Sequence, residues 1–191
     1  MRGFIFSQFS HESGAGFTII EVIVAIFLLT VGAVGVYSLV NQALMSASIL
    51  SSRLTAVYLA QEGVEIGRNI RDGNWLEMAD GLQCGGTNVE WADGLPFSPP
   101  KDRRGQYDTA VSDPCDGLPA HQDPPTPLII NSEGFYADTG SGITTPFTRV
   151  IHIEKPESGP NTWREITVIV RWRERGRTHN TIAQEKIYNW R

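Results

Sequence analysis

Residues 17–40 read FTIIEVIVAIFLLTVGAVGVYSLV and carry one charged side chain, Glu21. As an α-helix, a segment of this length measures about 36 Å, which exceeds the roughly 30 Å hydrocarbon core of a bilayer. All 11 prolines lie between Pro96 and Pro160, so none interrupts a helix in the first 95 residues. The sequence therefore predicts a long N-terminal helix whose first half spans a membrane.

A cleaved secretory signal peptide is the main alternative for this segment. Such peptides combine a basic start, an apolar stretch of about 7–15 residues and a small-x-small cleavage site. Here the apolar run is longer, Arg2 is the only basic residue among the first 16, and Ser46-Ala47-Ser48 is a poor cleavage site. We therefore expect the apolar helix to be retained in the mature protein.

Glu21 stands out because a carboxylate in an apolar helix is costly unless it reaches the interface or a partner. It ends the sequence Gly16-Phe17-Thr18-Ile19-Ile20-Glu21, in which a glycine precedes an aromatic residue and the acid follows at the fifth position after the glycine. Together with the apolar run, residues 16–40 resemble the class III signal of prepilins. Prepilins are the precursors of the type IV pilin and type II secretion pseudopilin superfamily.

The resemblance implies a cleaved leader, residues 1–16, cut between Gly16 and Phe17 by prepilin peptidase. It also implies N-methylation of the new Phe17 amine and a role for Glu21 in fibre assembly. In a fibre, the Glu21 carboxylate of one subunit would meet the Phe17 ammonium of its neighbour, so that two costly charges satisfy each other. The implied partners are other pilin or pseudopilin subunits, the inner-membrane assembly platform and membrane lipid. The implied location is the cytoplasmic membrane, with the C-terminal head outside the cytoplasm, and then a fibre at the cell surface.

The same stretch favours one group within the superfamily. Residues 21–25, Glu-Val-Ile-Val-Ala, resemble the Glu-Val-Leu-Val-Ala run of PilV-type minor pilins and of pseudopilin I. Ser38 stands where many major pilins carry a proline. The resemblance thus implies a minor pilin or pseudopilin, and it leaves open whether the fibre is a pilus, a secretion pseudopilus or a competence fibre.

Residues 41–72 continue the helical spacing with a more polar composition. We expect this amphipathic helix to be continuous with the membrane segment and to end near Arg71, since Asp72-Gly73-Asn74 supplies a stop signal. Gly63 and Gly67 match the small-xxx-small pattern of paired helices, but the polar surroundings argue against helix pairing. The face that we expect to cover a sheet carries Leu44, Ala47, Leu50, Leu54, Tyr58 and Val64.

Residues 73–126 are rich in Gly, Pro and Asp and predict a loop-dominated region. They contain the only two cysteines, Cys84 and Cys115, which lie in an oxidising compartment if the membrane interpretation holds. A disulfide between them would stabilise the head by about 3–4 kcal/mol in the chain-entropy model. Two free thiols are the alternative. We expect no metal site, because two cysteines without a nearby pair of histidines fall short of four ligands.

Residues 127–191 predict an antiparallel β-sheet. A hairpin is expected from residues 128–130 to residues 135–137, followed by three longer strands within residues 147–153, 163–173 and 178–190. The apolar face of this sheet needs a cover, which the amphipathic helix can provide. The predicted fold class is therefore α+β: a long N-terminal helix, half in the membrane and half amphipathic, packed on a small antiparallel head. This is also the fold of the pilins.

Composition and motifs limit the classes of function that the sequence allows. Apolar residues make up 41% of the 191-residue chain and net charge is −5, which argues against a disordered or collagen-like chain. Residues 72–138 carry 12 acids and 3 bases, whereas residues 139–191 carry 5 acids and 9 bases. The four histidines show no metal-ligand spacing, and no nucleophile, phosphate-loop or dinucleotide motif occurs. We therefore expect a structural protein without cofactor or enzymatic activity.

A basic segment suggests a second class of function. Residues 171–177 read RWRERGR, so Arg171, Arg173, Arg175 and Arg177 surround Trp172, and basic side chains beside an aromatic surface are typical of nucleic-acid contacts. Trp172 shares a face with Val168 and Val170, however, which places it in the core and makes the arginines a solvated hairpin edge. The alternative to a fibre subunit is a membrane-anchored module whose head serves adhesion or contacts DNA.

Overall fold

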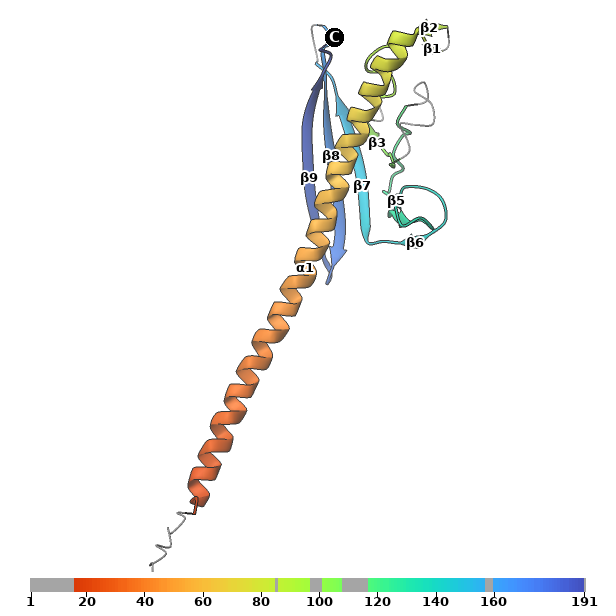
Figure 1. Ribbon diagram of the computed structural model, residues 1–191. Helices are drawn as coiled ribbons and strands as arrows, with labels where there is room; N and C mark the ends of the chain where they lie inside the picture. The colour runs from red at the N-terminus through yellow and green to blue at the C-terminus, as the bar shows by residue number, and fades with distance from the viewer. Residues whose placement is uncertain (1–15, 85, 97–100, 108–116, 157–159, 191) are drawn as a thin grey trace, which may run out of the picture. The chain divides into compact units, whose positions relative to one another are not determined.

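The computed structural model describes residues 16–84, 86–96, 101–107, 117–156 and 160–190 (Figure 1). The fold is α+β, with one long N-terminal helix and antiparallel sheets in the C-terminal part, as predicted. The chain forms two compact units, the first ending at Ala47 and the second beginning at Ser48. The second unit, which holds the sheets, is called the head below.

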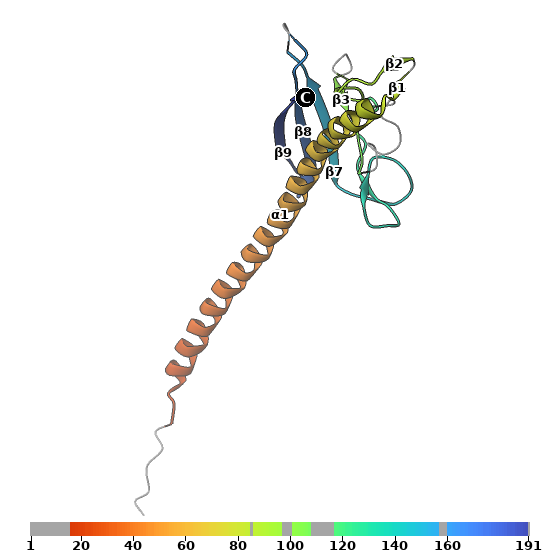
Figure 2. The ribbon, with the colours of Figure 1, turned by 45° about the horizontal axis from the view of Figure 1, so that its top comes forward.

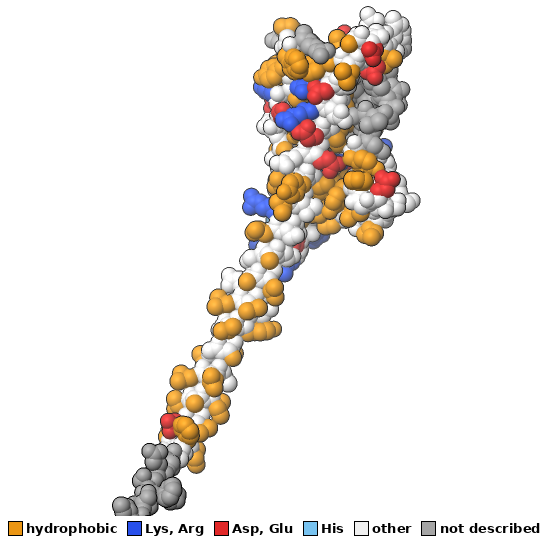
Figure 3. Space-filling view, viewed as in Figure 1, with side chains coloured by type: hydrophobic (Ala, Val, Ile, Leu, Met, Phe, Trp, Pro, Cys, Tyr) orange, Lys and Arg blue, Asp and Glu red, His pale blue; other side chains and the backbone are white. Residues whose placement is uncertain are grey.

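Helix α1 runs from Ile19 to Asp80, and its residues up to Ala47 belong to the first unit. The apolar side chains of this part are exposed all round the helix, and Figure 3 shows them scattered along its visible surface. Among the described residues, α1 contains the one segment long and apolar enough to cross a bilayer, with a mean hydropathy of 2.7. A helix that is apolar on every side requires a lipid or protein environment.

The helix continues beyond the predicted end near Arg71. Asp72-Gly73-Asn74 lies inside α1, which ends at Asp80 and is followed by Gly81 with a φ of 72°. Tertiary contacts override the local stop signal: the Asn74 amide donates to the carbonyls of Trp91 (3.1 Å) and Asp93 (2.7 Å), and Trp75 is buried. The last turns of α1 thus belong to the head core.

The main sheet has four antiparallel strands in the order β3-β7-β8-β9. Strand β7 (Phe147–Glu154) pairs with β8 (Trp163–Glu174), which pairs with β9 (Arg177–Tyr188), confirming the three long predicted strands. Arg175 and Gly176 form the β8–β9 turn with φ values of 51° and 77°. The short strand β3 (Asp102–Arg103), which the sequence analysis did not anticipate, adds one edge and leaves β9 as the other.

Smaller sheets complete the head. The predicted hairpin is confirmed: β4 (Ile129–Ile130) pairs with β5 (Tyr136–Ala137), and β6 (Ile143–Thr144) joins its other side. Strands β1 (Gln83–Cys84) and β2 (Thr87–Asn88) form a two-stranded ribbon directly after α1. Most of the described residues between Gly81 and Pro127 are irregular, which agrees with the expected loop-dominated region.

The core lies between the head part of α1 and one face of the main sheet, as the two ribbon views agree (Figures 1 and 2). Ile166, Val168, Val170 and Trp172 of β8 all face it and are buried, as predicted. From α1 the core takes a narrow stripe with several small residues: Ala56, Leu59, Ala60, Gly63, Val64, Gly67 and Ile70.

The predicted covering face of the helix is therefore wrong for all its members except Val64. Leu50 is 70% exposed, and Leu44, Ala47, Leu54 and Tyr58 are exposed as well. The reason is the close approach of the helix to β8: a Cβ on Gly63 would stand 2.7 Å from Val168 Cγ1, and one on Gly67 would overlap Ile166 Cδ1. Glycines allow this contact, whereas leucines on that face would prevent it.

Candidate functional site

The start of α1 is organised by Thr18. Its Oγ1 accepts a hydrogen bond from the N–H of Glu21 (3.3 Å), and its carbonyl accepts one from Val22 (3.2 Å). Thr18-x-x-Glu21 is thus a capping-box sequence with Thr18 as the N-cap, and Glu21 stands in the first turn, where the helix dipole favours a negative charge. Glu21 therefore has a local helix-capping role available to it besides any role between subunits.

The predicted cleavage site lies directly before this cap. Phe17 is 80% exposed, and a Cβ built on Gly16 would meet nothing within 4 Å. The bond between Gly16 and Phe17 is therefore open to an external peptidase within the described residues. Among the described residues, no contact requires a glycine at position 16.

Cleavage at this bond would change the charge at the end of the helix. The freed amine of Phe17 would be a cation beside the positive end of the helix dipole, which is unfavourable without an anion nearby. Glu21 is the only acidic residue of the 24-residue apolar segment. A helix with one terminal cation and one carboxylate four residues later has the charges required for pairing with a copy of itself.

The head contains an ionic cluster under α1 that the sequence analysis did not single out. Arg149 of β7 is buried, and its Nη1 donates to the carbonyl of Leu59 (3.2 Å) while Nη2 donates to the carbonyl of Gly105. Glu62 Oε1 lies 3.2 Å from Arg149 Nη1 and supplies the countercharge. The cluster ties the helix, β7 and the loop after β3 together.

Asp138 belongs to the same cluster. Burial raises the pKa of its carboxyl to about 6, against the opposing effects of the positive charge of Arg149 and a hydrogen bond from the Gly105 backbone. Glu62 raises the pKa further through its negative charge. The buried guanidinium of Arg149 thus interacts with the charges of two carboxyl groups, and Asp138 gains a proton in mildly acidic solution.

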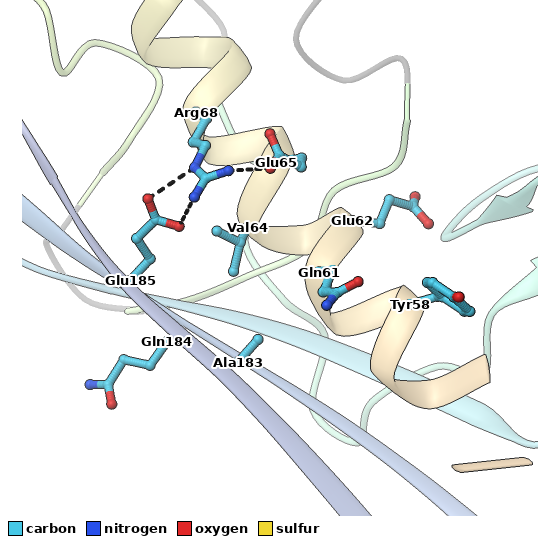
Figure 4. Close-up of a pocket in the computed structure, with 9 residues that line it drawn as sticks. All are labelled: Tyr58, Gln61, Glu62, Val64, Glu65, Arg68, Ala183, Gln184 and Glu185. Carbon is cyan, nitrogen blue, oxygen red and sulfur yellow. Dashed lines mark hydrogen bonds and ion pairs between the residues drawn. The ribbon is translucent and has the colours of Figure 1, made fainter. Parts of the chain in front are cut away.

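A polar groove lies between α1 and the edge strand β9 (Figure 4). At one end, Arg68 donates to both carboxylate oxygens of Glu185 and also to Glu65, and these contacts raise its pKa. In Figure 4 the guanidinium of Arg68 points toward the carboxylates and away from the rest of the groove. The groove therefore holds its own ion pairs and offers no nucleophile with a base beside it. Its lining consists of Tyr58, Gln61, Glu62, Val64, Glu65, Arg68, Ala183, Gln184 and Glu185.

The four arginines proposed for nucleic-acid contact lie at the β8–β9 end of the head. Arg171 and Arg173 are exposed on the face of β8 opposite the core, and Arg175 and Arg177 form or flank the turn. Trp172 is only 4% exposed and stacks on His179 with ring centroids 5.3 Å apart. The structure therefore keeps the arginines accessible but removes the aromatic surface on which a base could stack.

Two further expectations concern ligand groups. Cys115 lies outside the described residues, so the predicted disulfide from Cys84 to Cys115 remains a prediction. Within the described parts of the chain, no three His, Cys, Asp or Glu side chains form a group able to hold a metal ion.

Sequence reasoning missed the cluster of Arg149, Glu62 and Asp138, although one signal was present. Arg149 alternates with Phe147, Ile151 and Ile153 on the apolar face of its strand, and a charge at such a position requires a buried partner. Which acid would meet it depends on how α1 lies on the sheet. That placement is not encoded locally.

Comparison with known proteins identifies the N-terminal region. Residues 14–37 match the family model described as the prokaryotic N-terminal methylation motif, which is the prepilin signal of type IV pilins and pseudopilins. The match contains Gly16, Phe17 and Glu21 and most of the apolar segment. No curated protein and no solved structure gives a significant match to the chain. The chain thus carries a prepilin-type signal at residues 14–37.

Proposed function

We propose that this protein is a structural subunit, a minor pilin or pseudopilin, of a type IV pilus or a type II secretion-like fibre. Prepilin peptidase cleaves it between Gly16 and Phe17, the Phe17 amine is methylated, and the mature chain assembles through α1. The observation that carries the proposal is the methylation motif at residues 14–37, which lies on a helix with exposed apolar side chains. In a soluble enzyme, such a helix would expose its apolar side chains to water.

The proposed life cycle has two stages. Before assembly, residues 17–40 anchor the protein in the cytoplasmic membrane, with the head outside the cytoplasm. During assembly the same apolar surface leaves the lipid and packs against the helices of neighbouring subunits, which replaces one apolar environment by another. Assembly thereby requires no unfolding of the head.

Glu21 provides the specificity of this packing. Its carboxylate pairs with the methylated amine of Phe17 in the neighbouring subunit, and a subunit packed out of register leaves both charges unpaired in an apolar bundle. We assign the minor or pseudopilin type on the resemblance of residues 21–25 and on Ser38 in place of a proline.

Mass spectrometry of the N-terminal peptide, taken from native membranes or from the sheared surface fraction, tests the proposal. We expect a chain that begins at N-methyl-Phe17. A chain that begins at Met1 or near Ser48 would contradict prepilin processing and would favour the alternative, an anchored or secreted module.

A matched pair of glycine variants separates recognition by the peptidase from folding. Positions 16 and 32 both leave open space where a Cβ would stand, so neither substitution strains the described structure. We expect Gly16→Val to abolish cleavage and Gly32→Ala to leave it unchanged. Cleavage of both variants at the wild-type rate would refute the assignment of the site.

A further inference from the structure

The turn between β8 and β9 carries the strongest local concentration of positive charge in the head. Arg171, Arg173, Arg175 and Arg177 fall within seven residues, and Glu174 is the only acid among them. All four arginines are exposed, and among the described residues no ion pair within 4.0 Å holds their guanidinium groups. Figure 3 shows blue Lys and Arg side chains at this end of the head.

A hydrogen bond joins the end of β8, next to the turn, to the first helical residues of the head. Ser48 Oγ donates a hydrogen bond of 2.8 Å to Glu174 Oε1. This hydrogen bond lowers the pKa of Glu174, so the carboxylate that accepts it is charged at neutral pH. The position of the turn is therefore tied to Ser48.

Chain length then limits the distance from the turn to the bilayer. Ser48 is eight positions beyond Val40, the last residue of the apolar run. These eight positions span about 12 Å as a helix and at most about 29 Å when fully extended. The headgroup layer adds about 5–8 Å on each side of the hydrocarbon core. Along a helix, Ser48 therefore follows the end of the apolar run by a distance comparable to the thickness of the headgroup layer plus about one Debye length, roughly 8–10 Å.

We propose that the arginines of the β8–β9 turn, Arg171, Arg173, Arg175 and Arg177, bind the phosphate groups of anionic phospholipids while the protein is anchored in the membrane. Guanidinium groups form paired hydrogen bonds to phosphate, and positive charges near a membrane span are attracted by anionic lipid. The inference rests on the anchored stage of the proposed function. It adds a second, electrostatic contact with the membrane that must break when the subunit enters the fibre.

Lipid is favoured over nucleic acid by two observations. The short stretch of chain between Val40 and Ser48 limits how far the turn can lie from the membrane, and the ring of Trp172 beside the arginines is buried. Non-specific binding of single strands relies on such stacking in addition to positive charge.

Hydrogen–deuterium exchange of the full chain in lipid nanodiscs tests the inference. We expect the amides of residues 171–178 to exchange at least about threefold more slowly in discs with about 30% phosphatidylglycerol than in phosphatidylcholine alone. About 0.5 M NaCl should remove the difference, because it screens exposed charges. The peptide covering residues 17–40 reports membrane insertion in the same samples.

Two double variants provide the charge control. Arg175→Gln/Arg177→Gln should lose most of the lipid-dependent protection. Lys101→Gln/Lys155→Gln removes two charges near the opposite end of β7 and should retain it. Lys101 is exposed and pairs with Glu154, which lies at the end of β7 remote from the turn.

Three outcomes would overturn the inference. Equal exchange of the turn in both lipids, with residues 17–40 protected in both, would refute the lipid contact and leave the anchor intact. Rapid exchange of residues 17–40 in both lipids would refute the anchor, and the inference would fall with it. Slower exchange on addition of DNA, with no effect of anionic lipid, would assign the arginines to nucleic acid.

Discussion

Arg149 Nη1 lies 3.2 Å from Glu62 Oε1, so a buried cation on the central part of the sheet meets a carboxylate on the covering helix. The guanidinium is 1% exposed and the Glu62 side chain 31% exposed. The contact is an ion pair, and the Arg149 hydrogen bonds go instead to backbone carbonyls. A charge this deeply buried makes the pair a condition of correct docking between α1 and β7.

Removal of Glu62 should destabilise the head. We expect Glu62→Leu to lower the free energy of unfolding by about 3 kcal/mol, because it removes the carboxylate that lies 3.2 Å from the buried guanidinium of Arg149. The double variant Glu62→Leu/Arg149→Leu should recover much of this loss. Urea unfolding of the full chain in detergent, followed by tryptophan fluorescence, measures both.

Glu65→Leu is the matched control for this experiment. Glu65 lies three residues after Glu62 on the same helix and pairs with Arg68 at the surface, where ion pairs contribute at most about 1 kcal/mol. Equal losses for Glu62→Leu and Glu65→Leu would contradict a special role for the buried pair.

Asp138 should make stability depend on pH. Its pKa is raised from 3.8 to about 6 in the folded protein. The contribution of the protonated carboxyl to the free energy of unfolding is therefore complete below about pH 4 and is lost as pH rises through 6. The full effect is about 3 kcal/mol, since one pKa unit corresponds to about 1.4 kcal/mol. Asp138→Asn should abolish this component, seen as the difference between wild-type and variant unfolding curves from pH 4 to 8.

A second variant checks the electrostatic cause of this shift. Glu62 raises the pKa of Asp138 through its negative charge. Glu62→Gln should therefore lower the pH at which the Asp138 component is lost. An unchanged midpoint would mean that the two carboxyl groups do not interact.

The glycine contacts predict opposite effects of one substitution at two sites of α1. Gly67→Ala should destabilise the head by about 1–3 kcal/mol, because the new Cβ overlaps Ile166 Cδ1. Gly73→Ala should stabilise it by up to about 1 kcal/mol, since that Cβ meets nothing within 4 Å and alanine favours the helix. Thermal unfolding of both variants distinguishes steric from helix-propensity effects.

Shortening the opposing side chain supplies the rescue. Ile166→Val removes the Cδ1 atom that the alanine at position 67 would meet. We expect Gly67→Ala/Ile166→Val to be more stable than Gly67→Ala alone. A double variant with the summed losses of the two single variants would show that the steric explanation is wrong.

Glu21 should control incorporation into the fibre. Glu21→Gln removes the charge expected to pair with a neighbouring Phe17 amine, so we expect membrane levels to be kept and fibre incorporation to fall at least about tenfold, a loss equivalent to about 1.4 kcal/mol. Immunoblots of sheared fibres and membranes measure the ratio. Glu133→Gln, which alters an exposed acid of the head, should behave as wild type.

Local signals in the sequence predicted much of the fold. The apolar run of residues 17–40 and the strand patterns of β7 and β8 each act over a few neighbouring residues; the run from Ile19 onward lies in helix α1, and the strands lie where they were predicted. The methylation motif is equally local, and its family model matches where the resemblance to prepilins was found.

The errors arose where distant parts of the chain meet. The helix end was misjudged because the Asn74 side chain bonds carbonyls 17 and 19 residues away, which no local stop signal reveals. The packed face was misjudged because leucines at helical spacing outweighed Gly63 and Gly67 in the apolar pattern. The reason for a glycine at these two positions becomes clear only from the close contact with β8, which leaves no room for a Cβ.

The close packing of β8 against Gly63 and Gly67 also has a mechanical consequence. A pull along the axis of α1 would drive the larger side chains before and after each glycine into Val168 and Ile166. A force along the helix axis would therefore be transmitted to the sheet by steric contact between interdigitated side chains. This packing would oppose separation of the main sheet from α1 when a pulling force acts on the helix.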